Sequence, residues 1–88
     1  MKEYLNKFVY LHLEISNQDT AVKHLYYLCA YVINIDDNHI TFLDDNGELN
    51  TKKREDISEI KLSYKTPKYN LNEKLKELKN AEWNRTIK

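Results

Sequence analysis

The chain is 88 residues long, with 41% hydrophobic and 32% charged residues and a single glycine, proline and cysteine. This length accommodates one domain and excludes two, the lone Cys29 excludes an intramolecular disulfide, and no Cys/His spacing matches a zinc motif. The formal net charge is zero, but residues 1–67 carry eight Lys/Arg against eleven Asp/Glu, whereas residues 68–88 carry six against three. An acidic body with a basic tail argues against a protein that binds nucleic acid over its whole surface, because phosphate neutralisation dominates such binding.

The sequence contains neither a membrane-spanning run nor a recognisable secretory signal. The apolar stretch after Lys7 is interrupted by His12 and Glu14, and no small-residue cleavage site follows it. We therefore expect a cytoplasmic protein without a membrane partner, and a single thiol agrees with a reducing compartment.

The first third of the chain predicts a helical turn followed by a strand. Residues 1–7 are expected to form one or two helical turns, and residues 8–16 alternate between apolar and polar, which is typical of a half-buried strand. Residues 17–20 predict a turn. Residues 21–27 fit either a short capped helix or the start of a long strand, and from Leu28 onward β-branched and aromatic residues favour strand.

The middle of the chain predicts a β-meander. Strand-type residues run from 30 to 36 and from 39 to 43, separated by an Asp/Asn-rich turn. The pair Asn46–Gly47 indicates a tight hairpin, because such turns require positive φ angles. The acidic residues around this pair superficially resemble a calcium loop, but with Gly47 at the sixth loop position Phe42 would occupy the first ligand position.

The two remaining predicted strands differ in composition, one polar and one with regularly placed apolar residues. Residues 48–54 predict a charged edge strand in which Leu49 and Thr51 face inward. Residues 55–57 predict one tight helical turn, which leads into a last strand containing Ile60 and Leu62.

The C-terminal tail predicts an α-helix. Pro67 ends the sheet because proline cannot donate to a strand ladder. Asn70 is a good N-cap with Glu73 three residues later, and a narrow apolar stripe follows at Leu71, Leu75 and Leu78. We expect residues 1–66 to form the β domain and residues 67–88 a helical tail, which packs either on the chain's own sheet or on a partner.

The meander resembles a known family. The pattern Ala30-x-Val32-x-x-Ile35-Asp36, then Ile40-x-Phe42-x-Asp44, Gly47 and Asp56-Ile57-x-x-Ile60 resembles the core of small SH3-type β-barrels. It is most similar to the Sm-like proteins (the Hfq and Sm superfamily) and to the YolD-like bacterial proteins, over roughly residues 8–64. Those families place a small residue where Ala30 stands, which lets the second strand bend sharply.

The resemblance implies a mainly β fold: a small five-stranded Sm/SH3-like barrel with a short N-terminal helix and a C-terminal α-helix. Sm-like subunits often pair the fourth strand with the fifth strand of a neighbour, so a homo-oligomer is implied. The family's RNA sites correspond here to residues 36–39 and 52–54. The chain departs from the family at Arg54, which is followed by Glu55 rather than glycine, and it lacks the Tyr-Lys-His signature of the bacterial RNA chaperone.

These considerations predict a non-enzymatic binding module for nucleic acid or nucleotide. An asparagine amide can hold a base, an aromatic or imidazole ring can stack on it, and cations can contact phosphate. The candidate ligand-binding residues are Tyr26, Tyr27, Tyr31, Asn38, His39, Lys52, Lys53 and Arg54. The alternatives are that Asn38 and His39 are ordinary turn residues, that the three cations are solvated edge-strand charges, and that the tyrosines are packing residues.

A second hypothesis is a small inhibitor or adaptor of the kind carried by phages or mobile elements. Its acidic barrel face would mimic nucleic-acid charge and bind a basic host protein. The residues of that face are Asp36, Asp37, Asp44, Asp45 and Glu48.

The sequence predicts no catalytic site, cofactor or metal site. His12, His24 and His39 are scattered without paired-ligand spacing, and one glycine in the whole chain excludes a glycine-rich phosphate loop. Cys29, in an apolar run, is expected to be a small core residue, and a reactive thiol is the alternative.

Overall fold

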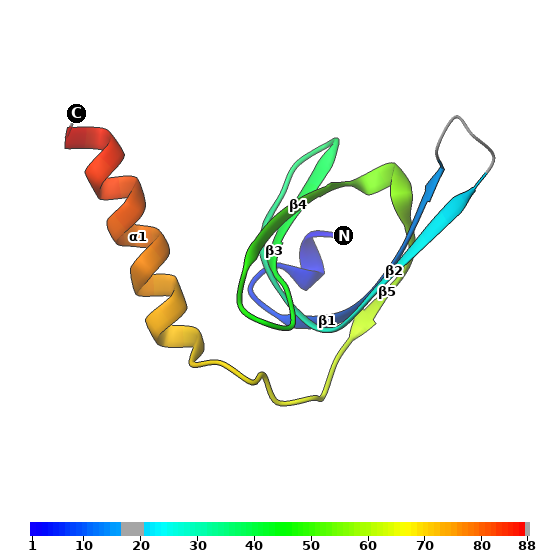
Figure 1. Ribbon diagram of the computed structural model, residues 1–88, viewed down its shortest axis with the longest axis horizontal. Helices are drawn as coiled ribbons and strands as arrows, with labels where there is room; N and C mark the ends of the chain where they lie inside the picture. Colours follow the sequence, from blue (N-terminus) through cyan, green and yellow to red (C-terminus); the bar gives the residue numbers. More distant parts are fainter. Residues whose placement is uncertain (17–20, 88) are drawn as a thin grey trace.

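The computed structural model describes residues 1–16 and 21–87, with side chains described as far as residue 79. This part of the chain forms one antiparallel sheet of five strands and a C-terminal helix (Figure 1). The strands are β1 (Phe8–Ser16), β2 (Val22–Ile35), β3 (His39–Leu43), β4 (Leu49–Lys53) and β5 (Ile57–Leu62). The turn predicted for residues 17–20 lies outside the described residues. Of the two alternatives for residues 21–27, the long strand is correct, since β2 begins at Val22.

The strands are arranged in the order β4-β3-β2-β1-β5, so β4 and β5 are the two edges. Figure 1 shows the sheet curling strongly around its core, but no β4–β5 pairing joins its edges within the described residues. The prediction of a mainly β fold with five strands is therefore confirmed, whereas the predicted Sm/SH3-like barrel is not, because the sheet is not closed over the described residues. The chain passes from β4 to β5 through a 3-10 turn, η2 (Arg54–Asp56), instead of pairing the two strands directly.

The long strand β2 is irregular at two places, and Ala30 lies between them. Opposite β1, Val9 pairs with Ala30 and Leu11 pairs with Tyr27, so two residues of β2 face one of β1. Opposite β3, the register shifts again between Val32 and Asn34. Such bulges bend a strand and increase its twist. Ala30 is fully buried in the core, as a small residue at a sharp bend is expected to be.

The core fills the concave side of the curved sheet. It consists of fully buried residues from the first three strands: Val9, Leu11, Leu13, Ala30, Val32, Ile40 and Phe42. The ring of Tyr27 meets Phe42 edge-on, with 4.9 Å between ring centroids. The alternation in residues 8–16 predicted the buried face of β1 correctly. Apolar residues two apart lie on the same face of a strand, and in β1 that face is the buried one.

Two short 3-10 turns cover the ends of the sheet. The predicted N-terminal helical segment is present only as η1 (Lys2–Tyr4), which packs Tyr4 against the core. The predicted turn before the last strand is η2.

The β3–β4 hairpin forms where the Asn46–Gly47 pair predicted it. Gly47 has a φ of +82°, which a glycine adopts without strain. The Asp44 carboxylate accepts hydrogen bonds from the backbone N–H groups of Asn46 and Glu48 at 2.9 and 3.0 Å. The predicted facing of β4 is wrong: Leu49 is 51% exposed and Thr51 is also exposed.

The prediction for β4 assigned alternate residues of the strand to the wrong faces of the sheet. Phe42, which points into the core, pairs with Asn50, so Asn50 and Lys52 lie on the inner side of the sheet. Thr51 instead pairs with Thr41, and their hydroxyl oxygens lie 3.1 Å apart on the outer side. A shift of one residue in register exchanges the two faces of a strand.

The C-terminal helix α1 (Leu71–Ile87) begins as predicted. The Asn70 side chain accepts a hydrogen bond from the Glu73 N–H at 3.1 Å, which caps the helix. Figure 1 shows α1 standing beside the sheet at the end of an extended segment. Leu75 and Leu78 face Ile33 and Leu49 across a groove of about 450 Å³. Within the described residues, no helix is sufficiently long and apolar to cross a membrane.

Candidate binding site between the β2–β3 turn and η2

The turn between β2 and β3 is held by the side chain of Asp36. Its Oδ1 accepts hydrogen bonds from the backbone N–H groups of Asn38 and His39 at 2.8 and 2.6 Å. These two bonds hold the pKa of the Asp36 carboxyl below its ordinary value, and the charges of His39 and Arg54 lower the pKa further. A side chain that bonds the backbone two residues further along is typical of Asx turns, so this local sequence specifies its own conformation.

Arg54 joins this turn to the segment that follows β4. Its backbone N–H donates to the Asn38 carbonyl oxygen at 2.8 Å, and its guanidinium Nη1 donates to the Asp36 carbonyl oxygen at 2.8 Å. The neighbouring strands are also in register here, with His39 opposite Lys53. The β2–β3 turn and the start of η2 therefore form one structural unit.

A surface hollow lies between the two segments. Its volume is about 290 Å³, and it is lined by Asp37, Asn38, His39, Lys53, Arg54 and Glu55. A second hollow of about 360 Å³ shares Asp37 and Arg54 with the first and adds Lys2 from η1. Both hollows are lined by cations as well as carboxylates, and Lys53 Nζ lies 4.0 Å from Glu55 Oε1. The site therefore offers hydrogen-bond donors and acceptors with balanced charge.

Half of the predicted ligand-binding residues meet at this hollow. Asn38, His39, Lys53 and Arg54 line it, although the two pairs lie far apart in the sequence. Lys52 is not among its lining residues and lies on the inner side of β4, opposite Ile40. Asn38 and His39 meet Lys53 and Arg54 because the β3–β4 hairpin returns the chain to the β2–β3 turn.

The predicted tyrosines lie elsewhere, in three different environments. Tyr27 packs edge-on against Phe42 in the core, and Tyr31 is half-buried against Phe8 with 5.0 Å between ring centroids. Tyr26 is 56% exposed on the outer face of the β1–β2 pair. None of these three tyrosines lines the hollow at Asn38 and His39.

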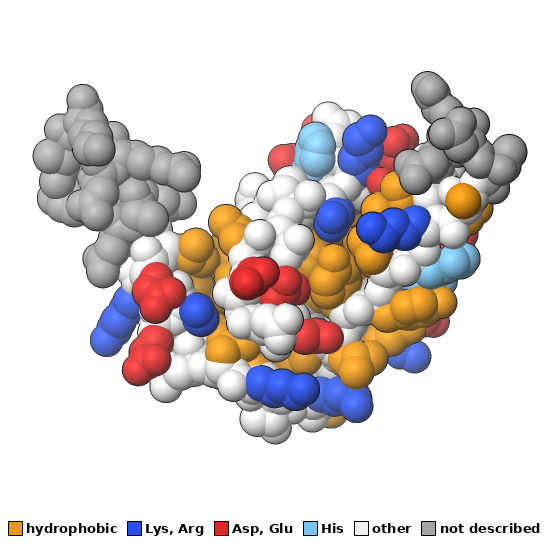
Figure 2. Space-filling model, viewed as in Figure 1, with side chains coloured by type: hydrophobic (Ala, Val, Ile, Leu, Met, Phe, Trp, Pro, Cys, Tyr) orange, Lys and Arg blue, Asp and Glu red, His pale blue; other side chains and the backbone are white. Residues whose placement is uncertain are grey.

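The carboxylates of the alternative, acidic site are divided between the two ends of β3. Asp36 and Asp37 lie at the β2–β3 turn, whereas Asp44, Asp45 and Glu48 lie in the β3–β4 hairpin. Figure 2 shows acidic and basic side chains interspersed over the visible face of the molecule.

Three of these carboxylates also hold the fold together. Asp36 and Asp44 accept the turn hydrogen bonds described above, and Asp45 accepts bonds from two backbone N–H groups of β2. Carboxylates that satisfy backbone donors have part of their hydrogen-bonding capacity already occupied.

The single cysteine is placed as predicted. Cys29 is only 5% exposed, and its thiol donates a hydrogen bond to the Lys65 carbonyl oxygen at 3.3 Å. Burial raises the pKa of this thiol, and the nearby Asp45 carboxylate raises the pKa further. Both effects disfavour the nucleophilic thiolate.

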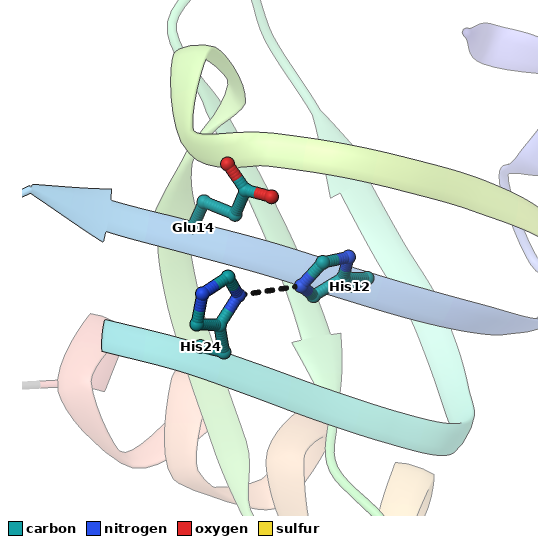
Figure 3. Close-up of side chains that lie close together, drawn as sticks. All are labelled: His12, Glu14 and His24. Atoms are coloured by element: carbon teal, nitrogen blue, oxygen red, sulfur yellow. Dashed lines mark hydrogen bonds between the residues drawn. The ribbon is translucent and has the colours of Figure 1, made fainter. Parts of the chain in front are cut away.

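Two of the histidines that are scattered along the sequence are neighbours in the fold, although their spacing predicted no paired ligands. His12 on β1 and His24 on β2 lie on the same face, and Figure 3 shows their rings turned toward one another with Glu14 beside them. The proximity of His12 and His24 can be predicted from the sequence only once the pairing register of β1 and β2 is known. Glu14 and His24 are each five positions from residue 19 in the sequence, and His12 and Tyr26 are each seven positions from it.

Neither a family model, nor a curated protein, nor a solved structure matches this chain in comparisons with known proteins. The fold and the hollow define a small antiparallel β protein that carries a polar surface site at one end of its sheet.

Proposed function

We propose that this chain is a non-enzymatic binding module that holds a nucleotide or a short single-stranded nucleic acid at the hollow beside Arg54. One observation carries the proposal. Two segments that the sequence predicted separately as ligand-binding, Asn38–His39 and Lys53–Arg54, line the same hollow. Its volume of about 290 Å³ is at the lower end of the range for small-molecule sites, which suits part of a nucleotide.

The proposed roles follow from the chemistry of each side chain. The Asn38 amide provides both a donor and an acceptor for the edge of a base, and the His39 ring provides a surface on which a base can stack. The Lys53 ammonium group is exposed and would contact phosphate. Arg54 would act mainly as a positioning residue, because its guanidinium already donates to the turn.

We also propose that the sheet is completed between copies of the chain. Both edge strands, β4 and β5, lack a partner on one side within the described residues, and unpaired strand edges readily accept another strand. Pairing β4 of one copy with β5 of the next would give the Sm-like homo-oligomer that the sequence resemblance implies. Because this contact joins two different surfaces, it would produce a ring if the rotation closes.

Fluorescence anisotropy with short RNA and DNA oligonucleotides tests the binding proposal. The full chain should bind at low salt, and the affinity should fall as salt increases, because cations on the protein displace counterions from phosphate. Asn38→Ala and Lys53→Ala should each weaken binding. Lys76→Ala on α1 removes the same charge as Lys53→Ala from a site away from the hollow, and should have no effect. Absence of binding at tens of micromolar protein would contradict the proposal.

The assembly proposal has a separate test. Light scattering coupled to size-exclusion chromatography should give a mass several times that of one chain, which is 10.6 kDa. A proline substitution at Thr51, within β4, should reduce that mass, because proline removes a backbone donor and disrupts strand pairing. A monomeric wild-type chain would refute assembly without bearing on the binding site.

A further inference from the structure

The outer face of the β1–β2 pair carries three side chains that can ligate a metal. Glu14 lies directly opposite His24, and His12 lies directly opposite Tyr26. Residues that face one another in an antiparallel pair, and residues two apart on one strand, project from the same side of the sheet. His12, Glu14 and His24 therefore share one side of a two-stranded framework, as Figure 3 shows.

The ligand atoms of these residues are close enough to surround one ion. His12 Nε2 and His24 Nδ1 lie 3.1 Å apart. Together with a carboxylate oxygen of Glu14, these atoms all lie within 4.8 Å of one another. Two imidazole nitrogens bound to the same zinc ion at about 2.0–2.1 Å, with a near-tetrahedral angle, would be about 3.3 Å apart. The present separation of these two nitrogens is therefore close to that of two ligands on one ion, and to bind it each ring would turn so that its lone pair points at the ion instead of at the other ring.

Neighbouring side chains already orient these ligands. The Tyr26 ring stacks on the His12 ring, with 4.4 Å between centroids and 6° between planes. The Ser58 hydroxyl on β5 donates to Glu14 Oε1 at 3.3 Å, which leaves Oε2 available. Such outer hydrogen bonds and contacts fix the orientation of metal ligands and strengthen binding. All of these residues lie on strands, which hold side chains more rigidly than loops do.

We propose that His12, Glu14 and His24 form a binding site for one divalent transition-metal ion, with Zn²⁺ as its simplest occupant. Two nitrogen ligands and one carboxylate suit zinc and its neighbours in the first transition series, whereas Mg²⁺ and Ca²⁺ prefer oxygen ligands alone. Three protein ligands leave at least one coordination position for water or for a group on another molecule. Glu59, opposite His12 on β5, adds a further negative charge to this face.

Isothermal titration calorimetry of the full chain with ZnCl₂, after treatment with a chelator, tests the proposal directly. One ion should bind per chain, and MgCl₂ should give no comparable signal. His12→Ala, His24→Ala and Glu14→Gln should each weaken zinc binding by more than tenfold, and Ser58→Ala by about tenfold, since loss of an outer hydrogen bond typically has that effect. His39→Ala, which removes the histidine at the start of β3, is the matched control and should bind zinc as the wild type does.

A second measurement identifies the bound atoms. Long-range ¹H–¹⁵N spectra should show zinc-dependent shifts of His12 Nε2 and His24 Nδ1, the two nitrogens that face one another. Circular dichroism of each variant without metal establishes that the sheet is intact. Equal affinity in the wild type and in the two histidine variants would overturn the proposal. One ion for every two chains would also overturn it, because His12, Glu14 and His24 belong to a single chain.

Discussion

The carboxylate of Asp45, in the β3–β4 hairpin, caps the backbone of Cys29 in β2. Its Oδ1 accepts a hydrogen bond from the Cys29 N–H at 2.8 Å, and its Oδ2 accepts one from the neighbouring Leu28 N–H at 3.1 Å. These N–H groups belong to the bulge at which β2 departs from its regular pairing with β1. One side chain therefore accepts hydrogen bonds from two residues that have no paired residue on β1 or β3, and it does so at the bulge of β2.

Replacing Asp45 should weaken the fold rather than only change the surface charge. Asp45→Ala is expected to lower the free energy of unfolding by about 1–3 kcal/mol, because it leaves the buried Cys29 donor unsatisfied. Urea denaturation followed by circular dichroism measures the change. Asp37→Ala is the control, since the Asp37 carboxylate accepts no hydrogen bond from any described residue. Equal stability of the two variants would show that the caps on β2 contribute little.

Gly47 should not tolerate a side chain. Its φ is +82°, and an added Cβ would lie 3.0 Å from Tyr69 Cγ and 3.1 Å from Lys74 Cε. Gly47→Ala should therefore lower the free energy of unfolding by about 1–2 kcal/mol from backbone strain alone. Asn46→Ala, at the preceding position, is the control. It shows how much stability is lost when a hairpin residue without the positive φ of Gly47 is replaced by alanine. Thermal denaturation of both variants is the measurement, and a Gly47→Ala protein as stable as the wild type would contradict the expectation.

The hydroxyl group of Tyr69 should be dispensable for stability. It is buried without a hydrogen-bond partner among the described residues, and burial, with smaller effects from nearby acidic groups, raises the pKa of Tyr69 to about 12. Because a buried polar group without a partner is unfavourable, Tyr69→Phe should leave the free energy of unfolding unchanged or raise it by up to about 1 kcal/mol. Tyr69→Ala should lower it, since the ring covers Gly47. Chemical denaturation of the pair separates the role of the hydroxyl from that of the ring, and a destabilised Tyr69→Phe variant would mean that the hydroxyl has a partner.

Asp36 should make the stability of the β2–β3 turn depend on pH in the acid range. Hydrogen bonds from Asn38 and His39 hold its pKa in the folded chain below the ordinary value of 3.8. A carboxyl with a lowered pKa stabilises the folded state above its ordinary pKa, and that contribution is lost as the pH falls through the lower, folded value. Asp36→Asn should therefore lose less stability than the wild type below pH 3.8. Denaturation curves at several acid pH values, with Asp37→Asn as the control, provide the measurement, and parallel pH profiles for all three proteins would refute the expectation.

The local sequence alone determined most of the secondary structure of this protein. The alternation over residues 8–16 predicted β1 and its buried face, because the period of a strand appears directly in the order of apolar and polar residues. The hairpin at Gly47 and the cap at Asn70 were equally predictable, since each depends on conformational preferences and hydrogen bonds between residues only a few positions apart. The β4 strand was located correctly, but its polar residues did not reveal which face is buried.

Only the tertiary structure decided how distant residues meet. The pairing register between β1 and β2 places His12 beside His24, and a slip of one residue would put them on opposite faces. The β3–β4 hairpin brings Arg54 to the turn at Asn38, and the bulge in β2 creates the donors that Asp45 satisfies. These relationships depend on register and bending, which result from the packing of the whole sheet around Phe42 and Leu11 and are not encoded in any one segment.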